Sequence, residues 1–234
     1  MNFIKLILYA ALGVVLFYVG VLVYHTIWDW KPAQVLPVAI SHPHPSDEDE
    51  SLEFLIWNVG FGGLGAETSF FYDGGETVIP EEAWTYKNEQ GIRDVLKKHQ
   101  HVEFVLLQEV DSLARRSHFN NQIRTIHTAL NRHSASFALN YNVAYVPLPI
   151  FNGMGEVRSG LASYSRLATH NNQRHAFDTQ FEWPRQVFFL DRCFLVQHAQ
   201  WQGKEIVVIN THCSAYDETG EFVAAEIQKM IDYG

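Results

Sequence analysis

An uninterrupted apolar run near the N-terminus limits what this chain can be more than any other feature. The nineteen residues from Leu6 to Tyr24 carry no charged side chain, and Ile27 and Trp28 extend the run. A helix rises about 1.5 Å per residue, so a run of this length comes close to the bilayer core, which is about 30 Å thick. Aromatic side chains lie towards its ends, where they favour the membrane interface.

Three interpretations of this run compete. We predict that residues 1–28 form a single-pass signal anchor, with the domain that follows outside the cytoplasm, because Lys5 precedes the run and Asp29 follows it. A cleaved signal peptide is less favoured, since the apolar region is long and no A-x-A site follows it. A buried core helix is the third interpretation.

Residues 29–51 are predicted to be a linker between this anchor and a domain over residues 52–234. Four prolines interrupt the segment, and residues 47–50 form an acidic run. His42 and His44 could bind a metal weakly, but a solvated linker is the expected state.

Composition indicates a packed domain without a broad basic face. Hydrophobic residues make up 47% of the chain and its formal net charge is −9. Proteins held on nucleic acid depend on clustered Lys and Arg, but a bound cation can supply the positive charge that the side chains lack. Two cysteines, Cys193 and Cys213, are too few for a disulfide framework. We expect two separate thiols, although a bridge across a hairpin is conceivable.

Apolar runs and helical spacings alternate along the domain. Strands are predicted at 52–59, 102–110, 137–146 and 161–165, with a hairpin of 185–200 and 204–211 around Gln202-Gly203. Helices are predicted at 89–100, 123–130 and 222–231. Strands and helices that intermix in this way favour an α/β (α+β) fold, in which helices pack on a mixed sheet.

Polar side chains stand at the ends of several apolar strands. Asn58 ends the first, Glu109 the second, and Asn210 with His212 a later one. Ligand sites of α/β sheets gather at strand ends. A carboxylate and an amide suit Mg²⁺ or Mn²⁺, which prefer oxygen ligands. Taken singly, an Asn, Glu or His at a strand end more often has a structural role, in a turn or a salt bridge, than a functional one.

Short strings around these residues resemble the endonuclease/exonuclease/phosphatase superfamily. They are IWNVG at 56–60, LQEVD at 107–111, GLASYSR at 160–166 and INTH at 209–212. The superfamily includes deoxyribonucleases, abasic-site endonucleases, inositol polyphosphate 5-phosphatases and neutral sphingomyelinases. The resemblance covers residues 52–234. It implies part of a four-layer α/β sandwich of mixed sheets flanked by helices, here preceded by one transmembrane helix.

The resemblance also implies roles for individual residues. Glu109 would be the principal metal ligand, and Asn58 would support the metal shell. Asn210 would orient the nucleophile or a phosphate oxygen, and His212 would donate to the scissile phosphate. The implied cofactor is Mg²⁺ or Mn²⁺.

Three arginines could meet the substrate phosphate under the same resemblance, namely Arg115 or Arg116 and Arg158. A solvated surface arginine is the competing interpretation for each. Asp111 could orient a neighbouring side chain.

The superfamily's later motifs, GD-x-N and SDH, do not occur in the 234 residues. We therefore expect an incomplete sandwich, and little activity from this chain alone. For a complete enzyme we predict divalent-metal-dependent hydrolysis of phosphate esters, with a nuclease-like phosphodiesterase first. A phospholipid or sugar-phosphate hydrolase is the alternative, and a catalytically inactive membrane-tethered binding module is the third. The expected partners are a phosphodiester substrate and the membrane, with no obligate protein partner.

Overall fold

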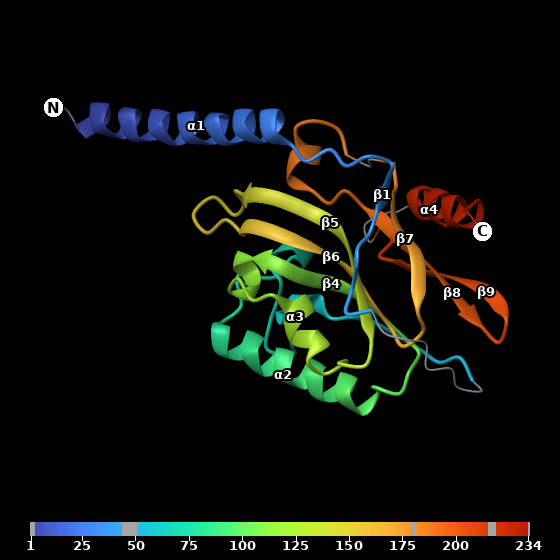
Figure 1. Cartoon of the computed structure of the whole chain (residues 1–234). Helices are drawn as coiled ribbons and strands as arrows, with labels where there is room; N and C mark the ends of the chain where they lie inside the picture. The colour runs from blue at the N-terminus through green and yellow to red at the C-terminus, as the bar shows by residue number, and fades with distance from the viewer. Residues whose placement is uncertain (1–2, 44–50, 179–180, 215–218, 234) are drawn as a thin grey trace.

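The first helix extends away from a compact two-sheet domain (Figure 1). The computed structural model describes residues 3–43, 51–178, 181–214 and 219–233. Helix α1, Phe3–Trp28, is long and apolar enough to cross a membrane, and none of its most apolar stretch is buried. A buried core helix would hide this stretch, so that interpretation does not fit the structure. Only the C-terminal half of α1 contacts the domain, where the Phe17 ring lies 6.4 Å from that of Tyr145.

A five-stranded sheet carries Asn58 at the end of β3 and Glu109 within β4, where the sequence predicted a strand end. Its order is β2-β5-β6-β4-β3, with bounds Ile40–Ser41, Ser134–Val146, Gly155–Ser165, Phe104–Ala114 and Phe54–Asn58. Strands β3 and β4 are parallel, because α2, Glu82–Lys98, crosses between them. Helices α2 and α3, Gln122–His127, cover the outer face (Figure 1), where Ile92 and Leu96 pack against Leu107.

A four-stranded sheet contains the third polar strand end. Its order is β1-β7-β8-β9, with bounds Val35–Pro37, Thr169–Ala176, Cys193–Trp201 and Lys204–Thr211. Strands β8 and β9 form the predicted hairpin, and its turn residues Gln202 and Gly203 both have positive φ, as a two-residue hairpin turn requires. Helix α4, Glu221–Ile231, lies on the outer side, where Met230 packs beside Phe194.

The two sheets pack face to face and enclose a core between them. Leu161 of β6 contacts Leu195 of β8, and Leu106 of β4 contacts Val208 of β9. Helix, sheet, sheet and helix therefore stack as four layers, which confirms the predicted fold class.

Several elements differ from the sequence-based prediction. In the expected linker, β1 and β2 pair with β7 and β5. Strand β7 was not predicted, because its inward positions include Asn172 and Arg174 and so break the apolar alternation. Residues 185–188, expected to begin a strand, form the 3₁₀ helix η4. The acidic run and His44 lie outside the described residues, and His42 stacks on His127 with ring centroids 3.9 Å apart.

The two cysteines are both free thiols, as expected.

Candidate metal and phosphate site

Glu109 stands at an irregularity in β4. Leu107 pairs with Ala162 and Val110 with Gly160, so β4 holds one extra residue against β6. Such a bulge redirects a side chain out of the regular alternation. Glu109 also has φ of +55°, a left-handed conformation that costs a non-glycine residue free energy. The bulge lies within β4, which continues to Ala114, and the carboxylate there is partly exposed.

Asn58 holds the Glu109 carboxylate from the neighbouring strand. Its Nδ2 donates to Oε1 of Glu109 at 2.7 Å, and its Oδ1 accepts from the backbone N–H of Gly60 at 2.9 Å. The amide oxygen is thus used in the turn after β3. This arrangement gives Asn58 a positioning contact with the carboxylate, whereas the sequence suggested a place in the metal shell.

The turn after β3 is a run of three left-handed residues, Gly60, Phe61 and Gly62. Its helical turn η1, Gly60–Gly62, is held by Gln122, whose Nε2 donates to the carbonyl of Phe61 at 2.6 Å. A side chain at Gly62 would meet Cγ of Glu89 at 2.9 Å. Glycine is therefore required at position 62 both by backbone conformation and by close packing.

His212 approaches Glu109 from the other sheet, just after β9. Its Nε2 lies 3.8 Å from Oε1 of Glu109, and Arg192 donates to its backbone carbonyl at 2.8 Å. Burial lowers the pKa of His212, while the Glu109 carboxylate opposes that shift.

Asn210 lies below this cluster and does not line the cavity described below. It is 2% exposed, its Oδ1 accepts from Gln108 at 2.7 Å, and its Nδ2 lies 3.2 Å from the carbonyls of Leu107 and Ala162. These hydrogen bonds connect β9 to β4 and β6, and they engage both the oxygen and the nitrogen of the Asn210 amide. The expected role of Asn210 at the nucleophile stays a prediction, and its contacts favour a supporting role.

Arg116 is buried, unlike the solvated arginine that the sequence favoured. It forms a two-pronged ion pair with Asp111, through Nε at 3.1 Å and Nη2 at 2.9 Å. Its guanidinium also stacks 3.9 Å from the centroid of the Phe61 ring. Asp111 therefore does orient a neighbour, and Arg116 is held at the wall of the cavity.

Arg158 and Arg115 are placed away from this cluster. Arg158 is half-exposed on β6 and pairs with Glu156 at 2.9 Å. Arg115 donates to the carbonyl of Gly153 at 2.6 Å. Neither lines the cavity at Glu109, so their contacts give no support to the expected role at substrate phosphate.

A cavity of about 990 Å³ opens beside Glu109. Asn58, Glu109, Arg116 and His212 form a polar part of its wall, and Tyr141 and Arg192 adjoin them. Sequence reasoning missed the last two, because neither falls in a recognisable string. Burial raises the pKa of Tyr141, whose hydroxyl donates to the carbonyl of Phe188 at 3.0 Å.

The donor set at Glu109 fits a hard divalent cation. Among the described residues, Oε2 of Glu109 accepts no hydrogen bond, and the carboxylate reaches a cavity large enough for water and a phosphate group. Mg²⁺ and Mn²⁺ are commonly held by one or two carboxylates, with waters and substrate phosphate completing the shell. One carboxylate fixed by an amide, beside an imidazole and two guanidinium groups, can therefore gather a cation and a phosphate.

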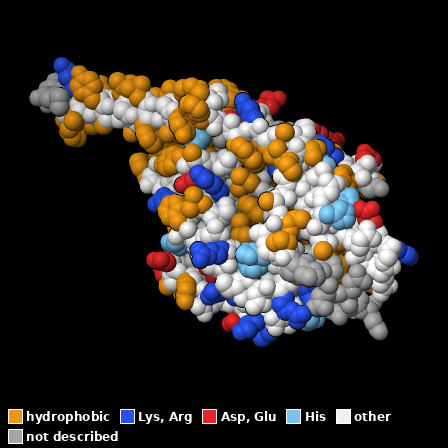
Figure 2. All heavy atoms as spheres, in the orientation of Figure 1, with side chains coloured by type: hydrophobic (Ala, Val, Ile, Leu, Met, Phe, Trp, Pro, Cys, Tyr) orange, Lys and Arg blue, Asp and Glu red, His pale blue; other side chains and the backbone are white. Residues whose placement is uncertain are grey.

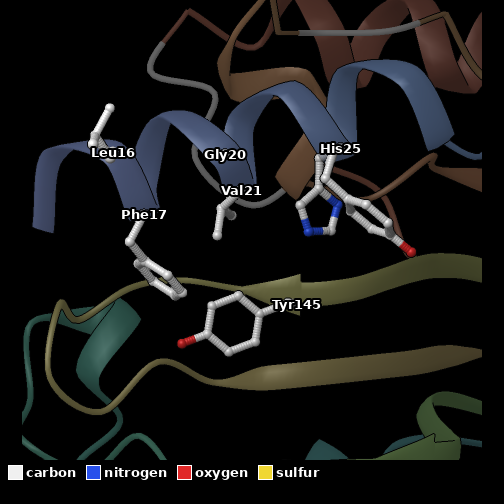
Figure 3. A pocket seen from close by; sticks show the side chains of 7 residues that line it. Leu16, Phe17, Gly20, Val21, His25 and Tyr145 are labelled. Carbon is white, nitrogen blue, oxygen red and sulfur yellow. The ribbon is translucent and has the colours of Figure 1, made fainter. Parts of the chain in front are cut away.

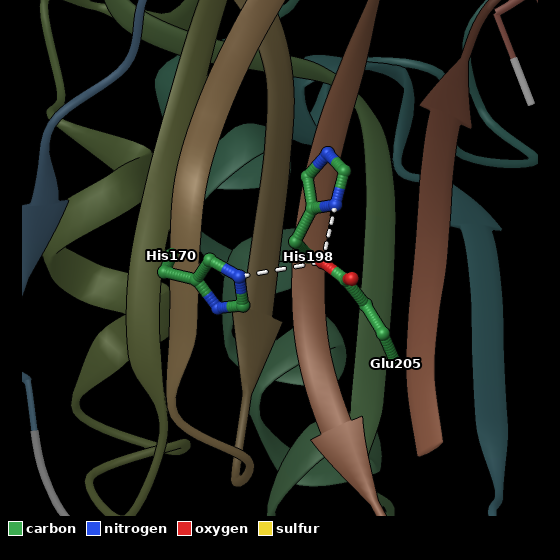
Figure 4. Close-up of side chains that lie close together, drawn as sticks. All are labelled: His170, His198 and Glu205. Atoms are coloured by element: carbon green, nitrogen blue, oxygen red, sulfur yellow. Dashed lines mark hydrogen bonds and ion pairs between the residues drawn. The ribbon is translucent and has the colours of Figure 1, made fainter.

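A second cluster of possible metal ligands lies elsewhere, on the outer face of the four-stranded sheet (Figure 4). It consists of His170, His198 and Glu205, whose ligand atoms lie within 4.8 Å of one another. Oε1 of Glu205 is 3.1 Å from Nδ1 of His198 and 3.5 Å from Nε2 of His170. This cluster is partly exposed and does not line the cavity at Glu109.

Comparison with solved structures gives a likeness of fold. A Beutenbergia cavernae endonuclease/exonuclease/phosphatase protein aligns with a TM-score of 0.54 at 17% identity, over 78% of this chain and 44% of that chain. A family protein from Leptotrichia buccalis gives 0.49 at 16% identity, over 79% and 63%. D. rerio TDP2, complexed with a single-strand DNA product, gives 0.46 at 13% identity, over 79% and 54%. This chain thus spans less than two thirds of the length of each. No protein-family model and no curated protein matches it.

Proposed function

We propose that this chain, which has the fold of endonuclease/exonuclease/phosphatase proteins, contributes a metal-dependent site for hydrolysis of phosphate esters. The observation that carries the proposal is the convergence of Asn58, Glu109 and His212, from β3, β4 and the end of β9, on one cavity. Two strand ends and the bulge within β4 meet there, and Glu109 at the bulge is held in a left-handed conformation. Strain of this kind concentrates at functional sites.

Each side chain has a distinct task in this proposal. Glu109 is the protein ligand for Mg²⁺ or Mn²⁺, and Asn58 fixes the rotamer of its carboxylate by the 2.7 Å hydrogen bond. A divalent cation at this position neutralises charge on a phosphate oxygen. His212 faces the same space and donates from Nε2 to a phosphate oxygen. Arg116 adds positive charge to the wall while Asp111 holds it in place.

Manganese binding tests the proposal without requiring turnover. Titration of the purified chain with Mn²⁺, followed by electron paramagnetic resonance, should show a bound ion in the wild type. Glu109→Gln keeps the size of the side chain but removes its charge, so it should weaken binding by about 10²-fold or more. Glu156→Gln is the matched control, because Glu156 is another partly exposed carboxylate on the same sheet that does not line the cavity.

The second ligand cluster supplies the decisive comparison. If Glu205→Gln abolishes Mn²⁺ binding while Glu109→Gln leaves it unchanged, the ion belongs to the His170–His198–Glu205 cluster, and the proposed centre is wrong. If the ion is lost with Glu109→Gln alone, the proposal stands. Thermal melting of each variant checks that the fold is retained.

A further inference from the structure

The cavity at Glu109 is mainly apolar, although one part of its wall carries charge. Phe70, Tyr72 and Leu148 line it together with Met154 and Phe188. Tyr72 donates its hydroxyl to the carbonyl of Leu148 at 2.6 Å, so this polar group is already used. A sugar-phosphate chain would leave so large an apolar wall without a partner. The cavity instead suits a molecule with a phosphate at one end and a hydrocarbon at the other.

Helix α1 forms part of the same wall. Tyr18, Val21 and Leu22 line the cavity. The same stretch of helix also forms a groove with Tyr145 of β5, in which the rings of Phe17 and Tyr145 meet edge to face (Figure 3). The candidate phosphate site and the membrane-length helix therefore border one continuous space.

The length of α1 that does not contact the domain determines how deep in the membrane this cavity lies. Leu16 is the first residue of α1 that lines a groove against the domain, so Phe3 to Val15 stand free. Thirteen residues of helix span about 20 Å, which is less than a bilayer core of about 30 Å. If α1 spans the bilayer, its residues Tyr18 and Leu22 therefore lie within the hydrocarbon core. The part of the domain that packs against them then lies at the same depth.

The surface next to α1 has the composition that such a position demands. The tip of the β5–β6 hairpin contacts the helix through Tyr18, whose hydroxyl donates to the carbonyl of Ile150 at 2.6 Å. Phe151 at this tip is 98% exposed, and Leu148 and Ile150 are half-exposed. Figure 2 shows hydrophobic side chains along α1 and on the adjoining face of the domain. Exposed apolar groups that continue from a membrane helix favour insertion into the bilayer.

Charge argues against a polyanion as the occupant. The chain has a formal net charge of −9, and the arginines of the cavity are already engaged. Arg116 is paired with Asp111, Arg192 donates to the carbonyls of His212 and Cys213, and Arg185 stacks on two phenylalanine rings. Nucleic acid binding relies on many phosphate contacts from Lys and Arg. The charges here suit one phosphate group.

We propose that the cavity binds a phospholipid of the bilayer that holds α1, with its hydrocarbon against the apolar wall and its phosphate at Glu109 and His212. This names the substrate class of the proposed phosphoesterase site and rests on that proposed function. The lipid enters sideways from the membrane, past Tyr18 and Leu22.

Photo-crosslinking tests the proposal. The full chain is placed in nanodiscs of phosphatidylcholine and phosphatidylglycerol that contain a phosphatidylcholine with a diazirine in its acyl chain, and labelled peptides are mapped by mass spectrometry. The cavity peptides around Phe70 and Phe188 should be labelled as well as α1. Leu22→Trp and Leu148→Trp fill the cavity from α1 and from the β5–β6 hairpin and should reduce that labelling by at least about tenfold. Val23→Trp and Ile150→Trp, their neighbours that do not line the cavity, should leave it unchanged.

Any of three results would overturn the inference. The first is labelling confined to the exposed side of α1, and the second is cavity labelling that all four variants leave unchanged. The third is tight binding of a single-stranded oligonucleotide that only the two cavity-filling variants weaken. Crosslinking in EDTA with Glu109→Gln separates this inference from the metal proposal, because lipid capture needs neither a bound ion nor hydrolysis. Labelled cavity peptides without Mn²⁺ binding would leave the lipid site standing alone.

Discussion

Glu109 is the residue on which the site depends, and its conformation is set by its neighbours. A left-handed φ of +55° costs a non-glycine residue about 1–2 kcal/mol, so other contacts must hold it. Asn58 supplies one of these contacts through Nδ2, and the backbone N–H of Gly60 in turn fixes Asn58. The carboxylate is therefore orientated before any cation arrives.

Removal of the Asn58 amide should weaken metal binding without removing the ligand. We expect Asn58→Ala to lower Mn²⁺ affinity by about 10- to 100-fold, since partners that orient a metal ligand contribute on that scale. Isothermal titration calorimetry measures the change. Asn88→Ala is the control, because Asn88 donates to the exposed Glu67 instead. Equal affinities in the wild type and Asn58→Ala would show that the hydrogen bond does not orient Glu109.

Polar residues that follow apolar runs were the part of the site that the sequence could predict, although β4 continues to Ala114 where the sequence predicted its end near Glu109. Asn58, Glu109 and His212 follow apolar runs, so the sequence itself marks them, and the structure brings them together. Asn210 follows such a run as well, but the alternation of β9 turns it into the space between the sheets. Arg192 and Tyr141 come from elements that meet only through tertiary packing, so no local string identifies them.

At the scale of elements, the turn after β3 and the bulge in β4 shape the site together. Both depart from regular geometry. They are supported by Glu89 of α2 and Gln122 of α3, and Nε2 of Gln122 donates a hydrogen bond to Oε1 of Glu89 at 2.9 Å. Burial raises the pKa of Glu89, while its hydrogen bonds from Gln122 and Asn120 oppose that shift. The sequence predicts the strands on either side of the turn and bulge but not these supports.

Two glycine substitutions should change stability in opposite directions. Gly62→Ala places a methyl group 2.9 Å from Glu89 at φ of +66°, so we expect the free energy of unfolding to fall by about 1–2 kcal/mol. Gly91→Ala lies in α2 with nothing within 4 Å of the added methyl group, so we expect a gain of about 0.5–1 kcal/mol. Thermal melting in one detergent compares them. A stabilising Gly62→Ala would contradict the described geometry of the turn.

The polar strand β7 explains why the prediction of elements was incomplete. Apolar runs identify β3, β4 and β8, although β4 and β8 also bury the polar residues Gln108 and Gln197. In β7 the inward Arg174 donates to the carbonyls of Leu139 and Asp191, so hydrogen bonds take the place of apolar contacts. The short strands β1 and β2 depend on partners far along the chain, and nothing local predicts them.

At the scale of the whole molecule, the position of α1 against the domain brings the predicted anchor helix to the candidate site. The sequence predicts an anchor followed by a free linker, and the structure instead packs the end of α1 on β5 and η4. His25 lies 4.9 Å from Phe188 between ring centroids, and Trp183 donates to Thr26 at 3.1 Å. The packing of α1 on the domain could not be predicted from the sequence. It depends on the β5–β6 connection and on the segment before β8, both of which line the cavity. On the basis of this packing we propose a lipid substrate, whereas the sequence put a nuclease substrate first.

The depth of the β5–β6 hairpin tests this arrangement. A nitroxide on Phe151→Cys, in a Cys213→Ser background that leaves only the buried Cys193, should be reached by oxygen but not by a water-soluble nickel complex in vesicles. The same label on Lys204→Cys, at the exposed β8–β9 turn, should show the reverse. Power saturation measures both. Nickel accessibility at 151 equal to that at 204 would place the hairpin in water.

An anomalous difference map from crystals of this chain grown with Mn²⁺ would locate the bound ion itself. We expect a peak about 2 Å from a carboxylate oxygen of Glu109, on the side that faces the cavity and His212. A peak only at His170, His198 and Glu205, or a Glu109 carboxylate without an ion when Mn²⁺ saturates the protein in solution, would contradict this expectation.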